Sequence, residues 1–135
     1  MFDVTYNKRS GIVRSVITGT LTFALIDEIA YVTNKYMDQA RNDFGRAYYL
    51  IDASHAVVQP REIIAKIEEV GSFLRGPDDR LAILVSAVLN RMQANRLLAM
   101  LGQTGGDAET FLDESEACIW LCRPASDRAT AKTVH

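Results

Sequence analysis

Two apolar runs without polar alternation constrain the fold of this chain more than any other feature of its sequence. Ala47 to Ile51 and Leu81 to Val85 contain no charged residue. A strand with one wet face alternates apolar and polar residues, so these runs predict strands that are buried on both faces, as in a parallel sheet. Such strands need cover on both sides of the sheet.

The N-terminal part of the chain predicts a hairpin followed by a helix. Phe2, Val4 and Tyr6 alternate with polar residues, and the alternation resumes from Ile12 to Gly19 after a turn. From Phe23 to Arg41, apolar residues recur at spacings of three and four, which is typical of a helix with one buried stripe. The predicted order is therefore strand, strand, helix before the first apolar run.

Further helical patterns follow each apolar run. The second predicted helix opens at Pro60 and ends at Gly76-Pro77, and the third has Ser86 as its N-cap and runs to Met100 or Leu101. Strands that are separated by helices run parallel with right-handed crossovers.

The C-terminal part predicts a short strand and a final helix. Glu109 to Phe111 is a weak strand candidate, and Asp113 followed by Glu116 has the spacing of a capping box at the start of a helix that Pro124 ends. We expect one α/β domain over residues 1–124, with a mixed sheet of four or five strands opened by an antiparallel hairpin, and a flexible tail over 125–135.

One face of this predicted sheet raises the question of what covers it. Consecutive right-handed crossovers place the helices on one side, yet the two apolar runs could not tolerate water on the other. Three kinds of cover are open: the last helix with Trp120, a second copy of the chain, or an apolar ligand in a groove lined by residues such as Tyr48, Leu84 and Met92.

Composition and charge exclude several classes of function. The formal net charge is -2, from 15 basic and 17 acidic residues, which offers no general attraction for nucleic acid. No apolar run approaches the roughly 20 residues that cross a bilayer, and no signal peptide is evident, so we expect a cytoplasmic protein. Cys118 and Cys122 read as small apolar residues in or near the core, and the sequence predicts neither a metal site nor a cofactor.

Several stretches together resemble the SpoIIAA-like group of bacterial proteins, which is related to STAS domains and is described as STAS/SEC14-like. They are the hairpin with Gly19 before the long helix, the strands Tyr49-Leu50-Ile51-Asp52 and Arg80 to Val85, and the ending Thr110 to Leu121, which is similar to that group's F-x-x-x-x-E-A-x-x-W-L finish. The resemblance covers the chain to about Arg123 and implies a half-wound βα superhelix.

The resemblance also implies a non-enzymatic regulatory or adaptor role, through binding of a protein partner. Anti-sigma antagonists of the STAS class carry Asp-Ser-Ser-Gly, with a phosphorylatable serine, where their second helix begins. Here that region reads Val57-Val58-Gln59-Pro60-Arg61, so the phosphorylation switch does not carry over, and Ser54 lies too early to take its place. The alternative is a carrier or sensor of a small apolar or anionic ligand, including a lipid.

The carboxyl ends of the two apolar strands predict where binding takes place. Ligands of parallel sheets settle beyond these ends, next to helix N-termini. The polar residues expected to gather there form a candidate ligand site: Asp52, Ser54, His55, Ser86 and Asn90, with Arg61 and Arg91 as anchors for an anion.

Two other interpretations of these residues stay open. Arg61 could pair with Asp52 or a nearby glutamate while Arg91 lies on a wet helix face, and neither arginine would then need a ligand. Asp52, Ser54 and His55 are also the residue types of a hydrolase triad. On an extended chain, however, Ser54 and His55 point to opposite sides, and the G-x-S-x-G turn of α/β-hydrolases is missing. No catalytic residue is therefore assigned.

Overall fold

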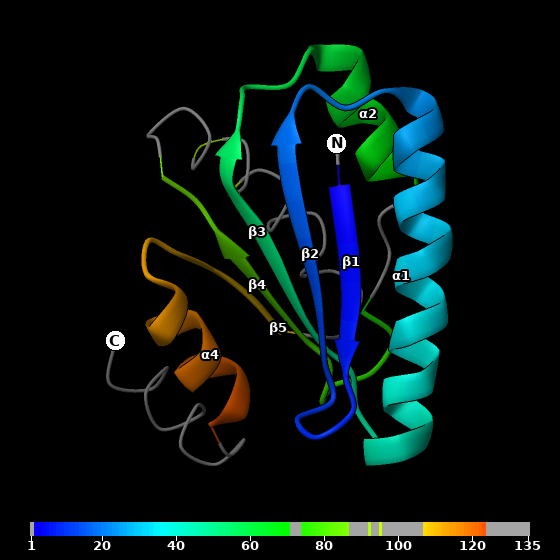
Figure 1. The fold of residues 1–135 in the computed structure, drawn as a ribbon, viewed down its shortest axis with the longest axis vertical. Coiled ribbons are helices and arrows are strands. Elements are labelled where there is room, and N and C mark those ends of the chain that lie inside the picture. Colours follow the sequence, from blue (N-terminus) through cyan, green and yellow to red (C-terminus); the bar gives the residue numbers. More distant parts are fainter. Residues whose placement is uncertain (1, 71–73, 87–91, 93–94, 96–106, 124–135) are drawn as a thin grey trace.

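The computed structural model describes residues 2–70, 74–86, 92, 95 and 107–123 of the chain. A five-stranded sheet in the order β1-β2-β3-β4-β5 forms its centre (Figure 1). The elements are β1 (Phe2–Asn7), β2 (Ile12–Gly19), α1 (Phe23–Phe44), β3 (Tyr48–Ala56), α2 (Arg61–Val70), β4 (Arg80–Leu84), β5 (Asp107–Phe111) and α4 (Glu114–Cys122).

Strand pairing confirms the predicted mixed sheet. β1 and β2 are antiparallel, while β2, β3, β4 and β5 pair in parallel. The weak strand candidate near the C-terminus is confirmed and begins two residues earlier than expected, at Asp107. Because every parallel neighbour in the sheet is also the next strand in sequence, the winding runs in one direction throughout.

The pleat of the central strands divides the core into two layers. Tyr49 and Leu81 point to the side of α1, where they pack with Val13 and Met37. Leu50 and Ala82, each one position further along, point to the other side and pack against α4. This alternation explains why neither apolar run shows a polar face, since both of its faces are buried.

α4 covers the face that the sequence predicted to be bare. Figure 1 shows α1 and α4 on opposite sides of the sheet, and Ala117 and Leu121 of α4 are fully buried against β3 and β4. Arg80 of β4 donates to the carbonyl oxygens of Trp120, Leu121 and Arg123 at the end of α4. The first of the three predicted kinds of cover is therefore the one observed over these strands.

Several predicted boundaries need correction. β3 does not end at Ile51 but continues to Ala56, because its later residues pair with the end of β2 after a register shift between Val16 and Thr18. α1 extends to Phe44, and α2 spans Arg61–Val70, so that Leu74, within the range predicted for this helix, lies outside it. Most of the third predicted helix lies outside the described residues; Met92 and Asn95 within it are helical.

A buried aspartate organises the amino end of the parallel strands. Asp79 is 3% exposed and accepts hydrogen bonds from the guanidinium of Arg41 and from the backbone N–H groups of Ala47 and Arg75. Its own carbonyl accepts from the N–H of Asp107. One residue thus joins the end of α1 to the starts of β3, β4 and β5.

Candidate functional site

Three of the predicted site residues come together at the C-terminal half of β3 and just after the end of β4. Asp52 is 9% exposed, and its Oδ1 accepts from the backbone N–H of Ser54 at 3.1 Å and from the Ser54 hydroxyl. The hydroxyl of Ser86 donates to the carbonyl oxygen of Ser54. The structure thus brings Asp52, Ser54 and Ser86 together, and their binding of a ligand stays a prediction.

The charge partner of Asp52 is Arg14 rather than Arg61. Nη2 of Arg14 lies 3.3 Å from Oδ2 of Asp52, and its Nη1 contacts Glu114 in the first turn of α4. Both oxygens of Asp52 therefore already have partners, and the cluster joins β2, β3 and α4. A carboxylate that is satisfied in this way fits a structural role better than the capture of a ligand.

Arg61, one of the two predicted anion anchors, is not drawn into this cluster. Arg61 is exposed in the first turn of α2 and has no ion pair within the part of the chain that the structure describes. Asn90 and Arg91 lie outside the described residues. The anion pocket with Arg61 and Arg91 as anchors therefore stays a prediction.

The hydrolase interpretation finds no geometric support among the described residues. The Ser54 hydroxyl donates to Asp52, whereas His55 is exposed and pairs along the sheet with Thr18. Ser54 and His55 occupy successive positions of β3, so their side chains leave opposite faces. No hydrogen bond joins Ser54 to His55 in the described part of the chain. The described residues as a whole contain no group of three or more potential metal ligands. Cys118 and Cys122 are both free thiols, and Cys122 is exposed.

Sequence reasoning missed Gln59, a buried amide in the connection between β3 and α2. Its Oε1 accepts from the N–H of Leu21 at 2.9 Å, and its Nε2 donates to the carbonyl oxygens of Gly19 and Val57. The side chain is 9% exposed. Gln59 therefore fixes the β3–α2 connection against the β2–α1 connection, about 40 residues away in sequence.

Large apolar side chains project from the two connections that Gln59 joins. Val57 and Val58 are 49% and 48% exposed, and Phe23, at the start of α1, is 52% exposed. Figure 1 shows both connections at the same end of the molecule, beyond the carboxyl ends of β2 and β3. We call Phe23, Val57 and Val58 the apolar rim. The only sequence signal for it was a pair of β-branched residues directly before Gln59 and Pro60.

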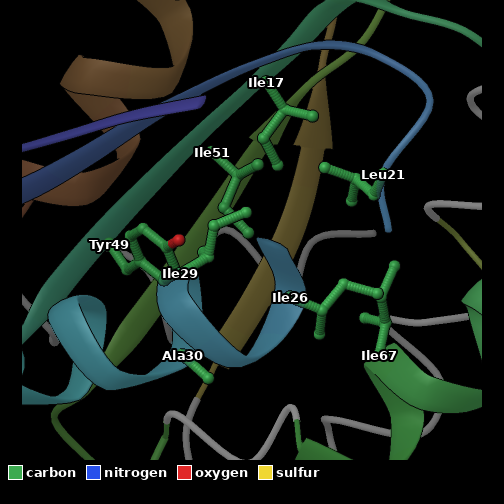
Figure 2. Close-up of a pocket in the computed structure, with 8 residues that line it drawn as sticks. All are labelled: Ile17, Leu21, Ile26, Ile29, Ala30, Tyr49, Ile51 and Ile67. Carbon is green, nitrogen blue, oxygen red and sulfur yellow. The ribbon is translucent and has the colours of Figure 1, made fainter. Parts of the chain in front are cut away.

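An apolar cavity of about 70 Å³ lies beside the rim, between the sheet, α1 and α2 (Figure 2). Leu21, Ala30, Tyr49 and five isoleucines line it. The isoleucines are Ile17, Ile26, Ile29, Ile51 and Ile67. Ile51 is only partly buried although it sits on a central strand, because the cavity leaves its side chain incompletely covered.

Three buried hydroxyl groups cluster around Tyr49 in the wall of the cavity. The Tyr49 hydroxyl lies 2.8 Å from Ser15 Oγ and 3.3 Å from Thr33 Oγ1, and all three residues are essentially inaccessible. Burial raises the pKa of Tyr49 above its ordinary value of 10.0, while the hydrogen bonds to Ser15 and Thr33 partly oppose that shift. Tyr49 is therefore a neutral phenol that is fixed in position at one wall of the cavity.

Comparison with known proteins supplies the fold and no activity. No protein-family model and no curated protein matches the sequence. A crystal structure of an uncharacterised protein of the DUF3478 family with a SpoIIAA-like fold, from Shewanella loihica PV-4, is similar to it with a TM-score of 0.62. The two share 17% sequence identity over 90% of this chain and 93% of the other. This chain has a SpoIIAA-like fold.

Within this SpoIIAA-like fold, the segment before α2 carries valines in place of reactive groups. Val57, Val58, Gln59 and Pro60 lead into Arg61, and no serine stands among them. Among the described residues, every helix is too short or too polar to cross a bilayer. Exposed apolar side chains therefore stand beside exposed polar ones, such as His55 and Arg61, at this end of the SpoIIAA-like fold.

Proposed function

We propose that this chain is a cytoplasmic, non-enzymatic binding domain of the regulatory or adaptor kind, which grips a protein partner through the apolar rim. The observation that carries the proposal is the pair of half-exposed valines, Val57 and Val58, on a connection that the buried Gln59 holds in place. Apolar groups that are already ordered before binding lose little conformational entropy on association. A fixed apolar rim is therefore well suited to a partner's surface.

The polar residues nearby support binding rather than catalysis. The Asp52 carboxylate is engaged by Arg14 and Ser54, and the Ser54 hydroxyl donates to Asp52. A serine nucleophile needs a neighbouring base that is free to take its proton, and the Asp52 carboxylate is already held by the Ser54 N–H and by Arg14. We therefore assign no turnover to this edge and retain Asp52, Ser54 and Ser86 as its structural support.

The test compares partner capture by the wild type and by charged rim variants. Val57→Asp and Val58→Asp place a carboxylate where the partner would bury apolar surface, and Ile119→Asp makes the same change at another exposed position, on α4, where Ile119 is 59% exposed. Calorimetry with a purified captured partner should show at least tenfold weaker binding for each rim variant and unchanged binding for Ile119→Asp. Equal affinities for all three variants would contradict the proposal.

A second candidate function, the binding of a small apolar ligand, has the cavity in its favour. Its walls are almost entirely apolar, as expected of a ligand pocket. Its volume of about 70 Å³ is small, however, since pockets for drug-sized ligands measure roughly 300 to 1,000 Å³. Native mass spectrometry of the purified protein tests this candidate, since a retained ligand would appear as added mass.

A further inference from the structure

We propose that the cavity between α1, α2 and the sheet receives one aliphatic side chain, a leucine, isoleucine or valine, from the partner that docks on the apolar rim. This inference rests on the proposed function and specifies the side chain that anchors the partner to the rim. Protein interfaces concentrate their binding energy in a few side chains that fill preformed pockets. The cavity is an apolar pocket whose wall residue Leu21 is linked to Val57 of the rim through Gln59.

The size of the cavity selects the occupant. A protein cavity of about 150 Å³ accommodates a benzene ring. The present volume of about 70 Å³ is roughly half of that, so it holds three or four carbon atoms and excludes an aromatic ring. A branched aliphatic side chain has this size, and the isoleucine-rich walls match its lack of polar atoms.

The same size argues against a free ligand. At the best affinity per atom that small ligands reach, four carbon atoms give a dissociation constant of only about 10⁻⁴ to 10⁻⁵ M. A side chain of a folded partner does not depend on its own contacts alone, because the rest of the partner contacts the rim at the same time. The cavity therefore contributes most to affinity when its occupant belongs to a partner that also contacts the rim.

Hydrogen bonds connect the cavity to the rim and hold both in register. Leu21 forms part of the cavity wall, and its N–H donates to Gln59, which in turn donates to the carbonyl oxygen of Val57. An ion pair between Lys66 of α2 and Asp27 of α1, at 3.1 Å, ties the two helices that form the other walls. A partner that covers Val57 thus finds the cavity at a fixed position next to it.

The isoleucines in the walls allow a direct test on the full chain. Isoleucine methyl groups are labelled with ¹³C, and the protein is titrated with the N-acetyl amides of leucine, alanine and phenylalanine as probes. We expect saturable shifts of Ile17, Ile29 and Ile67 with the leucine probe in the range of about 1 to 10 mM, and none with the other two. Ile119 on α4 is the internal reference and should not shift.

Variants of the cavity make the test specific. Ala30→Leu fills the space and should abolish the leucine shifts while raising the melting temperature, because the new side chain occupies an existing void. Ala65→Leu makes the same change at an exposed position of α2 and should leave binding unchanged. Ile67→Ala enlarges the cavity and should admit the phenylalanine probe, so the inference stays testable even if Ala30→Leu does not fold.

The inference would be overturned by the absence of a saturable shift with the leucine probe, by equal shifts with the phenylalanine probe, or by unchanged leucine binding by Ala30→Leu. Micromolar binding of 1-butanol would also overturn it, since the cavity would then serve a free ligand. The rim variants Val57→Asp and Val58→Asp test the proposed function separately. Loss of partner binding in those variants without leucine binding in the cavity would leave the adaptor proposal standing and remove only its anchor.

Discussion

The two ends of the sheet are built from different chemistry. At the amino end, Asp79 and Arg80 are each 3% exposed and make hydrogen bonds to α1, β3, β5 and α4. At the carboxyl end, valines project into solvent and a cavity remains between α1 and α2. The contrast indicates that stability is concentrated at one end, which leaves the other free to carry incomplete packing and exposed apolar groups for binding.

The largest effect should come from Asp79→Ala. The substitution removes the acceptor of the N–H groups of Ala47 and Arg75 and one of the carboxylates that pair with Arg41, which keeps Asp38, so we expect a loss of about 2 to 5 kcal/mol in the free energy of unfolding. Urea unfolding followed by circular dichroism measures it. Asp78→Ala is the matched control, because Asp78 is exposed, and should stay within about 0.5 kcal/mol of wild type. Equal losses would contradict the assignment of the amino end as the stable one.

Two glycines sharpen the same comparison, since one lies at each end of β2. Gly11 and Gly19 have φ angles of 73° and 71°, so alanine at either position incurs about 1 to 2 kcal/mol of backbone strain. At Gly11 the added Cβ would also meet Arg46 and, at 2.6 Å, Phe44, whereas nothing lies within 4 Å at Gly19. Gly11→Ala should therefore lower the free energy of unfolding by about 1 to 3 kcal/mol more than Gly19→Ala does, as measured by thermal unfolding. Similar melting temperatures of the two variants would show that Phe44 and Arg46 move aside at little cost in free energy, which would contradict a rigid amino end.

A smaller effect, with a pH signature, is expected from Tyr49→Phe. Loss of the hydroxyl leaves Ser15 and Thr33 with fewer partners and should cost about 1 to 2 kcal/mol near pH 7. The pKa of folded Tyr49 is raised above 10.0, so unfolded Tyr49 releases its proton first. Wild-type stability therefore falls as the pH rises above about 10, and the fall should be shallower in Tyr49→Phe. Denaturant titrations at pH 8 to 11 measure this slope, with Tyr31→Phe at an exposed position as the control; a parallel decline in all three proteins would refute the prediction.

The smallest effect on stability should come from the rim. Val57 and Val58 are half-exposed, so the substitutions to aspartate should change the free energy of unfolding by no more than about 0.5 kcal/mol even where they abolish partner binding. Urea midpoints equal to that of wild type would establish that any lost binding reflects the surface alone. A large destabilisation would mean that the rim is part of the core, which would break the contrast between the two ends.

The fold was predictable where its signals are local. The apolar runs at Ala47 and Leu81 indicated buried parallel strands, and the Asp113 cap placed the start of α4, where its carboxylate accepts from the N–H groups of Ser115 and Glu116. The length of β3 was not predictable in this way. The end of β3 is extended because Thr18 and Gly19 of β2 pair with His55 and Ala56 after the register shift, and Ser54 lies within that irregularity.

The candidate site was predictable only in part, because its decisive contacts join distant residues. The clustering of Asp52, Ser54 and Ser86 follows from strand order, which the sequence indicated. The pairing of Asp52 with Arg14 across 38 residues does not, and neither does the burial of Gln59 against Gly19 and Leu21. An amide before a proline is typical of a solvated loop, and only the packed structure shows that it is enclosed.

The position of α4 in the chain has a consequence for biosynthesis. β3 and β4 present Leu50 and Ala82 to the side that only α4 covers among the described elements, and α4 ends at Cys122. A growing polypeptide emerges from the ribosome N-terminus first, so this apolar surface stays exposed to water until α4 has been translated. During that interval we expect the sheet without α4 to bind chaperones that recognise exposed apolar strands.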